Sequence, residues 1–158
     1  MTKKDRLVNL NRIGIGTVQW SEKDYGISSR KKRIDINTIR KTINLAKSNN
    51  INTYDTAYSY NNAEKILGNY FNDESIKIVT KTSKYKYTEN INTDVSDIIN
   101  NFYVSLGRLK KKSIYALLIH DPQILLNPIG SKIWEALLAL KKNKKISNLG
   151  VSIYTPEQ

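Results

Sequence analysis

The sequence predicts an α/β fold built on a parallel sheet, and two observations lead to this prediction. Short segments rich in Ile, Val, Leu and Tyr alternate with longer segments in which apolar residues recur at helical spacing. The resulting order βαβαβαβαβ implies parallel strands joined by right-handed helical crossovers. The chain has 158 residues, 39% hydrophobic and 25% charged, which fits one globular domain that can bury a core.

Five short segments have the composition of buried strands. The second of them, for example, is an apolar run that passes through a polar turn into a helix over residues 62–71. The predicted strands are 12–17, 52–55, 77–81, 114–120 and 147–152.

Three further helices are predicted from apolar periodicity and capping residues. The helix before the second strand begins behind Asp35, and the helix before the fourth strand begins behind Thr93 or Asp94. The apolar positions at helical spacing are Ile36, Ile39, Ile43 and Ala46 in the first helix, Val95, Ile98, Ile99, Phe102 and Leu106 in the third, and Ile133, Trp134, Leu137, Leu138 and Leu140 in the fourth.

The composition excludes several classes of site. The absence of cysteine excludes disulfides and thiolate metal sites, and a single His with scattered carboxylates offers no ligand spacing for a metal. The N-terminus "MTKKDRLVNL" lacks the apolar core of a signal peptide. The longest apolar runs, "YALLI" and "WEALLAL", are too short to span a bilayer. We therefore expect a soluble cytoplasmic protein with no metal and no membrane partner.

The net charge of +12 raises the alternative of a nucleic-acid partner. The basic residues form clusters at 29–33, 109–112 and 140–145, each at a predicted helix end or loop, where a solvated surface explains them. In the segment "KTSKYKYTEN" at 81–90, alternating Lys and Tyr suit contact with phosphates and bases, but a loop lining a cleft explains its place after the third strand more simply. No recognised binding motif accompanies the charge, so we expect no nucleic-acid partner.

Polar residues follow the predicted strands at the ends where α/β proteins place their chemistry. "GIGTVQW" follows the first strand, Asp55 and Tyr60 the second, Lys81 the third, His120 the fourth and Ser152 the fifth. Taken singly, each has a structural explanation. Asp55 can satisfy backbone donors in its turn, Lys81 can lie where the chain returns to solvent, and His120 can be a turn residue before "DP". Together they form a constellation on one rim.

An Asp, a Tyr and a Lys on one rim can form a proton-transfer unit. A tyrosine has a pKa of about 10, and proton exchange near neutrality requires this pKa to fall by roughly three units, or about 4 kcal/mol. An ammonium about 4 Å away supplies that amount at an effective dielectric near 20. Lys81 is therefore expected to tune Tyr60, and an ionised Asp55 is expected to keep Lys81 charged in a half-buried cleft.

The stretch "INTYDTAYSYNNAEKILG" at 51–68 resembles the signature D-T-A-x-x-Y-x-x-x-E-x-x-[IL]-G of the aldo-keto reductase family. "GIGT", "IVTK", "LLIHDP" and "KISNLGVSIY" match other blocks of this family in the right order, and "GTVQWSEKDYGIS" is closest to bacterial members found in sugar and surface-polysaccharide contexts. The resemblance implies a (β/α)₈ barrel of the TIM type, and reduction of an aldehyde or ketone with NADPH, with NADH as the alternative cofactor.

The resemblance also implies roles for single residues. Tyr60 corresponds to the general acid and Lys81 to its pKa partner. Asp55 corresponds to the brace of the Lys, and His120 to the group that orients the carbonyl. The implied cofactor-binding residues are Gly16, Thr17, Asp55 and Ser152, and the candidates for the substrate cleft are Trp20, Tyr25 and Tyr85.

Two features depart from the family pattern. Many members have Ser-Asn where this chain has Ser152 and Ile153, so one hydrogen bond to the nicotinamide carboxamide is expected to be missing or supplied elsewhere. A full barrel needs about 250 residues. We therefore interpret residues 1–158 as the N-terminal half of one domain, comprising four βα units and strand five, with no second domain. The later segments of the family, which clamp the cofactor phosphates, are therefore expected to be missing from these residues.

Three expectations follow from a half barrel. The isolated chain should lack reductase activity, and its first and fifth strands should be open to self-association. The alternative function is a non-catalytic truncated or split product that acts as a binding module.

A different dinucleotide site, of the Rossmann type, is not expected. Its G-x-G-x-x-G fingerprint would begin at Gly14 and Gly16, but Gln19 stands where the third glycine belongs. Asp35 does lie near the spacing at which that fingerprint places a ribose-binding acid.

Overall fold

The computed structural model describes residues 12–21, 34–60, 62–71, 76–84 and 91–156. Within them, five strands form one sheet in the order β1-β2-β3-β4-β5, and every neighbouring pair is parallel. The strands are β1 (Gly14–Gly16), β2 (Thr53–Asp55), β3 (Lys77–Lys81), β4 (Ile114–Ile119) and β5 (Ile146–Val151). The predicted α/β fold class with a parallel sheet is confirmed, and β1 and β5 form the two edges of this sheet.

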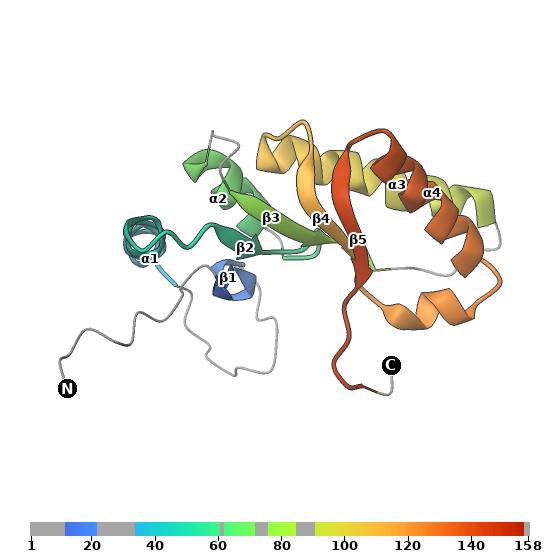
Figure 1. Cartoon of the computed structure of the whole chain (residues 1–158), viewed down its shortest axis with the longest axis horizontal. Helices are drawn as coiled ribbons and strands as arrows, with labels where there is room; N and C mark the ends of the chain where they lie inside the picture. Colours follow the sequence, from blue (N-terminus) through green and yellow to red (C-terminus); the bar gives the residue numbers. More distant parts are fainter. Residues whose placement is uncertain (1–11, 22–33, 61, 72–75, 85–90, 157–158) are drawn as a thin grey trace, which may run out of the picture.

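Helices connect the strands, and Figure 1 shows α2, α3 and α4 on one side of the sheet. Two short 3₁₀ helices, η2 and η3, follow β1 and β4. Helix α3 begins before both Thr93 and Asp94, so the predicted cap of this helix was placed too far along the chain. The helices are η2 (Val18–Trp20), α1 (Ile36–Ser48), α2 (Ala63–Tyr70), α3 (Ile91–Leu109), η3 (Pro122–Leu126) and α4 (Gly130–Lys142).

The start of α1 follows from the cap predicted at Asp35. One carboxylate oxygen of Asp35 accepts hydrogen bonds from the backbone N–H groups of Asn37 at 2.9 Å and Thr38 at 3.1 Å. The other oxygen accepts a bond from the hydroxyl of Thr38 at 2.6 Å. These bonds hold the pKa of Asp35 below its ordinary value, and the bond from the Thr38 hydroxyl has the largest effect. The cap satisfies amide groups that have no partner within the first turn of the helix.

The two faces of the sheet have different roles. Strand residues paired in register share a face, and successive residues alternate between faces. Tyr54 pairs with Ile78, and both are buried in the core cluster that includes the apolar residues of the helices. The next residue after Tyr54 is Asp55, and it pairs with Val79 on the opposite face. The face away from the core therefore carries the acid.

Three helices end in the same way, and these ends return the chain to the sheet. Asn50, Lys110 and Lys144 follow α1, α3 and α4 with φ of 57°, 52° and 55°, which is the left-handed conformation of a helix C-cap. The next N–H group in each case bonds back to a helix carbonyl: Ile51 to Ala46 at 2.9 Å, Lys111 to Leu106 at 3.1 Å and Lys145 to Leu140 at 2.9 Å.

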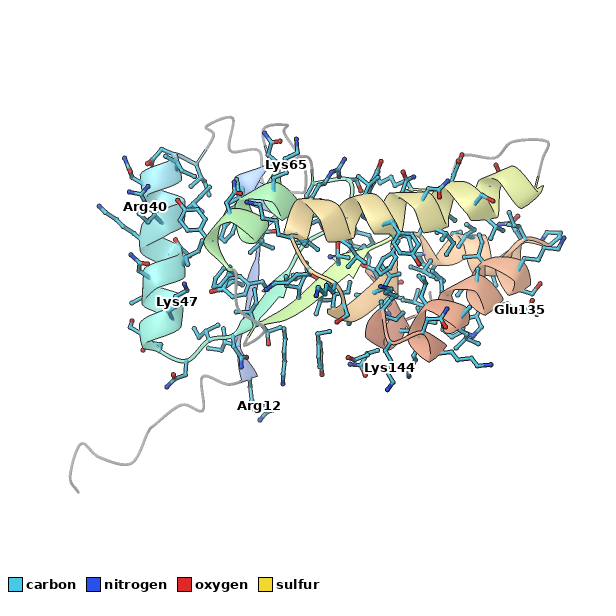
Figure 2. All side chains as sticks on the ribbon, turned by 90° about the horizontal axis from the view of Figure 1, so that it is seen from above. Arg12, Arg40, Lys47, Lys65, Glu135 and Lys144 are labelled. Atoms are coloured by element: carbon cyan, nitrogen blue, oxygen red, sulfur yellow. The ribbon has the colours of Figure 1, made fainter. Side chains whose placement is uncertain are left out.

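The basic residues are spread over the molecule. The clusters at 109–112 and 140–145 lie at the ends of α3 and α4, as predicted, and the cluster at 29–33 lies outside the described residues. Figure 2 shows the labelled basic residues Arg40 on α1, Lys65 on α2 and Lys144 after α4 on separate elements. In the described part of the chain, no helix is long and apolar enough to cross a membrane.

Candidate active site

The C-terminal ends of three adjacent strands bring four predicted residues to one place. Asp55 is the last residue of β2, Lys81 is the last residue of β3, and His120 comes directly after β4. Tyr60 lies in the connection from β2 to α2. Parallel pairing of the three strands aligns these ends, because each strand runs in the same direction as its neighbour.

Lys81 is held by three oxygen atoms. Its ammonium nitrogen donates to both carboxylate oxygens of Asp55 at 2.7 Å and to the backbone carbonyl of Thr56 at 2.9 Å. The Lys81 side chain is 8% exposed, whereas the Asp55 side chain is 44% exposed. Asp55 and Lys81 therefore form a direct ion pair, and the Asp55 carboxylate is the partner that faces solvent.

Tyr60 lies between Lys81 and His120. The Lys81 ammonium nitrogen is 5.2 Å from the centroid of the Tyr60 ring, and the ring of His120 meets that of Tyr60 edge-on, with centroids 6.1 Å apart. All three residues are buried. The structure thus places an acid, an ammonium, a phenol and an imidazole in one contiguous group.

The ring and backbone of His120 have defined partners. Its Nδ1 lies 3.2 Å from the hydroxyl oxygen of Ser59, and its backbone N–H donates to the hydroxyl of Thr82 at 3.2 Å. Burial lowers the pKa of His120 below its ordinary value, and the charge of Lys81 lowers it further. The imidazole is therefore neutral at neutral pH and carries a single N–H donor.

The cofactor-binding candidates lie on the same rim but differ in exposure. Gly16 ends β1, and a Cβ atom there would meet no atom within 4 Å. Ser152 comes directly after β5, is half-buried and donates its backbone N–H to Ile119 at 2.9 Å. Thr17 is fully buried, and its hydroxyl and N–H both donate to the Asp55 carbonyl, at 3.0 Å and 2.9 Å. The side chain of Thr17 therefore anchors Asp55 within the fold.

The predicted cleft residues are only partly described. Trp20, the last residue of η2, is 6% exposed and belongs to the buried core cluster. Tyr25 and Tyr85 lie outside the described residues, so their roles stay predictions. Among the residues that the structure describes, no three His, Cys, Asp or Glu side chains are grouped to hold a metal ion.

Sequence reasoning missed four partners of the site. Ser59 and Thr82, which contact His120, carry no signal beyond their places beside Tyr60 and Lys81. Glu64 and Arg108 contact the same loop or its neighbours. Glu64 had a signal, because it is the glutamate of the quoted signature and falls on the buried side of α2. A charged residue at such a position requires a buried partner.

Comparisons with known proteins identify the family and the fold of the chain. The model of the aldo/keto reductase family matches residues 12–158. A putative aldo-keto reductase from Pseudomonas aeruginosa is 26% identical with a TM-score of 0.69, and the match covers 88% of this chain and 54% of that one. A glycerol dehydrogenase from Gluconobacter oxydans is 24% identical with a TM-score of 0.66, over 91% of this chain and 45% of that one. A comparison with curated protein sequences finds no relative.

The match also describes how much of the fold is present. The chain spans about half the length of these solved structures. Its five-stranded parallel sheet with helices corresponds to part of the TIM-type barrel of aldo-keto reductases, as the sequence predicted. Bacterial proteins are among these neighbours. The family model covers nearly the whole chain, and the chain belongs to the aldo/keto reductase family.

Proposed function

We propose that these residues form the proton-transfer half of an NADPH-dependent reductase that converts an aldehyde or ketone to an alcohol. One observation carries the proposal: the ammonium of Lys81, paired with both oxygens of Asp55, lies 5.2 Å from the ring of Tyr60, and His120 lies at the edge of that ring. Family membership supports the reaction class, NAD(P)H-dependent reduction of small carbonyl compounds.

Tyr60 is the proposed proton donor. Negative charge develops on its phenol oxygen as the proton moves to the carbonyl oxygen. The ammonium of Lys81 lies 5.2 Å from the centroid of the ring. A positive charge roughly 5 Å from such an oxygen stabilises it by about 3 kcal/mol at an effective dielectric near 20. Asp55 keeps the ammonium in place, so that little reorganisation is needed when the proton moves.

His120 is the proposed orienting group. Its neutral ring can donate one hydrogen bond to the substrate carbonyl without carrying a competing positive charge. Ser59 contacts Nδ1 at 3.2 Å and so restricts rotation of the ring. Two donors, the phenol and the imidazole, then converge on one carbonyl oxygen.

The exposed end of β1 and the half-exposed carboxylate of Asp55 fit a nicotinamide ring. Gly16 leaves open space where any other residue would place a side chain, and Asp55 and Ser152 are the polar groups proposed to hold the carboxamide end. When bound, NADPH supplies the hydride that reaches the carbonyl carbon. We propose NADPH over NADH because the net charge of +12 favours the ligand with the extra phosphate.

The proposal is tested in a completed barrel, defined as residues 1–158 joined to the second half of the Pseudomonas aeruginosa relative. We expect this protein to oxidise NADPH in the presence of an aldehyde, and we expect Lys81→Met to lower kcat by at least about a hundredfold, because about 3 kcal/mol of charge stabilisation is lost. The measurement is NADPH absorbance against aldehyde concentration. A Lys81→Met variant that keeps most of its kcat would contradict the proposed role of the ammonium. Lys47→Met on α1 serves as the matched control.

By itself, the 158-residue chain is proposed to be inactive. Each of its edge strands, β1 and β5, is paired on one side only within the described sheet. We propose that these edges allow self-association. A non-catalytic binding module is the alternative function of such a chain.

A further inference from the structure

A buried carboxylate lies next to the loop from Thr56 to Tyr60, which carries the proposed proton donor. Glu64, in the first turn of α2, is 0% exposed. One of its oxygens accepts the hydroxyl hydrogen bond of Thr80 on β3 at 2.8 Å, and the other lies 3.3 Å from the guanidinium of Arg108 near the end of α3. Burial of a carboxylate is unfavourable unless it is paired, and this one joins three elements through its partners.

Arg108 reaches from Glu64 to the loop that carries the phenol. The same guanidinium nitrogen donates to the backbone carbonyl of Tyr58 at 3.1 Å, and the guanidinium carbon lies 4.6 Å from the centroid of the Tyr58 ring. The N–H of Tyr58 donates to the carbonyl of Lys81 at 3.2 Å. Tyr58 is therefore held at its ring, its carbonyl and its N–H, midway along the loop between Asp55 and Tyr60.

Gly68 allows Arg108 to come this close. A Cβ atom at Gly68 would lie 2.2 Å from the carbonyl oxygen of Arg108 and 2.8 Å from the carbonyl carbon of Leu109. Helices α2 and α3 therefore touch backbone to backbone at this point. Gly68 comes four residues after Glu64, so both lie on the same face of α2, the face that meets α3.

We propose that Glu64 and Arg108 are positioning residues that hold the loop from Thr56 to Tyr60 and thereby place Tyr60 between Lys81 and His120. The catalytic meaning of this placement rests on the proposed function. A displacement of Tyr58 moves the two residues that follow it. Ser59 would lose its 3.2 Å contact with His120, and the N–H of Tyr60 would lose its bond to Ala57 at 3.0 Å.

The test uses the 158-residue chain with ¹³C-labelled histidine. His120 is the only histidine, so its ring gives a single set of NMR signals. We expect Arg108→Gln to shift these ring signals and to speed hydrogen exchange of the Tyr60 amide about tenfold, the effect of losing one hydrogen bond from a charged donor. Arg40→Gln, an exposed position on α1, is the matched control and should change neither.

The double variant Glu64→Gln with Arg108→Gln controls for misfolding of the single variant, because it leaves no unpaired buried charge. It should fold and still show the shifted His120 signals and the faster Tyr60 exchange. Unchanged signals and unchanged exchange in both variants, with only a lower unfolding midpoint, would overturn the proposal, since that is the result of a purely structural ion pair.

These readouts need neither cofactor nor substrate, so the two proposals fail separately. If the completed barrel reduces no carbonyl while Arg108→Gln still moves the His120 signals, the proposed function fails and the positioning role stands. If the completed barrel is active, Arg108→Gln should lower kcat about tenfold and leave NADPH binding nearly unchanged. An active barrel in which Arg108→Gln has the kcat of Arg40→Gln would refute the positioning role alone.

Discussion

His120 is neutral in the folded chain because its burial and the charge of Lys81 both oppose protonation. Its pKa in the fold is therefore below the value of 6.5 that it has when unfolded. The unfolded chain takes up the proton first as the pH falls, so the free energy of unfolding decreases through and below about pH 6.5. The stabilising contribution is complete above the unfolded pKa and is lost as the pH falls toward the folded pKa.

We predict that His120→Gln removes this part of the pH dependence. The measurement is urea unfolding of the native chain and the variant at about pH 7.5 and about pH 5.5. The native chain should lose more stability between the two pH values than the variant loses, because only the native chain contains this imidazole. An equal loss in both would show that His120 is not held neutral by its surroundings.

Single residues show where sequence reasoning succeeded and where it could not. Asp55, Lys81 and His120 were located because parallel strands align their ends, so a pattern along the chain becomes a group in space. Ser59 and Arg108 could not be assigned in this way. Their partners lie 61 and 44 residues away, and no spacing rule connects a loop hydroxyl or a helix side chain to them.

Gly68 sets the distance between two elements. A Cβ atom at this position would lie 2.2 Å from the carbonyl oxygen of Arg108, so a methyl group there must push α2 away from α3. We predict that Gly68→Ala destabilises the fold by about 2 kcal/mol, in the range of overpacked cores. Gly107→Ala on α3 is the matched control. A Cβ there meets nothing within 4 Å, and alanine should stabilise the helix by up to about 1 kcal/mol.

Urea unfolding of both alanine variants checks this prediction. If Gly68→Ala is as stable as Gly107→Ala, then α2 and α3 do not approach this closely. The contact of Arg108 with Tyr58 would then lose its structural basis.

Most elements followed from sequence, but some boundaries did not. The Asp35 cap fixed the start of α1, since its carboxylate accepts two amide hydrogen bonds there. Asp94 resembled a cap but lies inside the first turn of α3, where a carboxylate is also favoured by the helix dipole. The first strand, predicted over 12–17, pairs only over 14–16, and Thr17 uses its N–H for Asp55. Side-chain type alone cannot separate these neighbouring positions.

At the scale of the whole molecule, the sheet is open at both edges within the described residues. We predict that the isolated 158-residue chain self-associates and shows no aldehyde-dependent oxidation of NADPH. It spans about half the length of the barrels that it matches, so several charge-assisted hydrogen bonds to the cofactor phosphates, each about 1.5–3 kcal/mol, are expected to be missing. Sedimentation and an absorbance assay test both parts. A monodisperse monomer that binds NADPH at micromolar concentration and oxidises it with an aldehyde would contradict the prediction.

We propose that Tyr60 gives the proton in a carbonyl reduction. The most direct test of this proposal compares Tyr60→Phe with Tyr103→Phe in the completed barrel, because Tyr103 is 48% exposed on α3. Both kcat with an aldehyde and the Kd of NADPH are measured. We predict that Tyr60→Phe abolishes turnover and leaves the Kd nearly intact, while Tyr103→Phe changes neither. Turnover that survives in Tyr60→Phe, or equal loss of turnover and cofactor binding, would contradict the claim and make Tyr60 a structural residue.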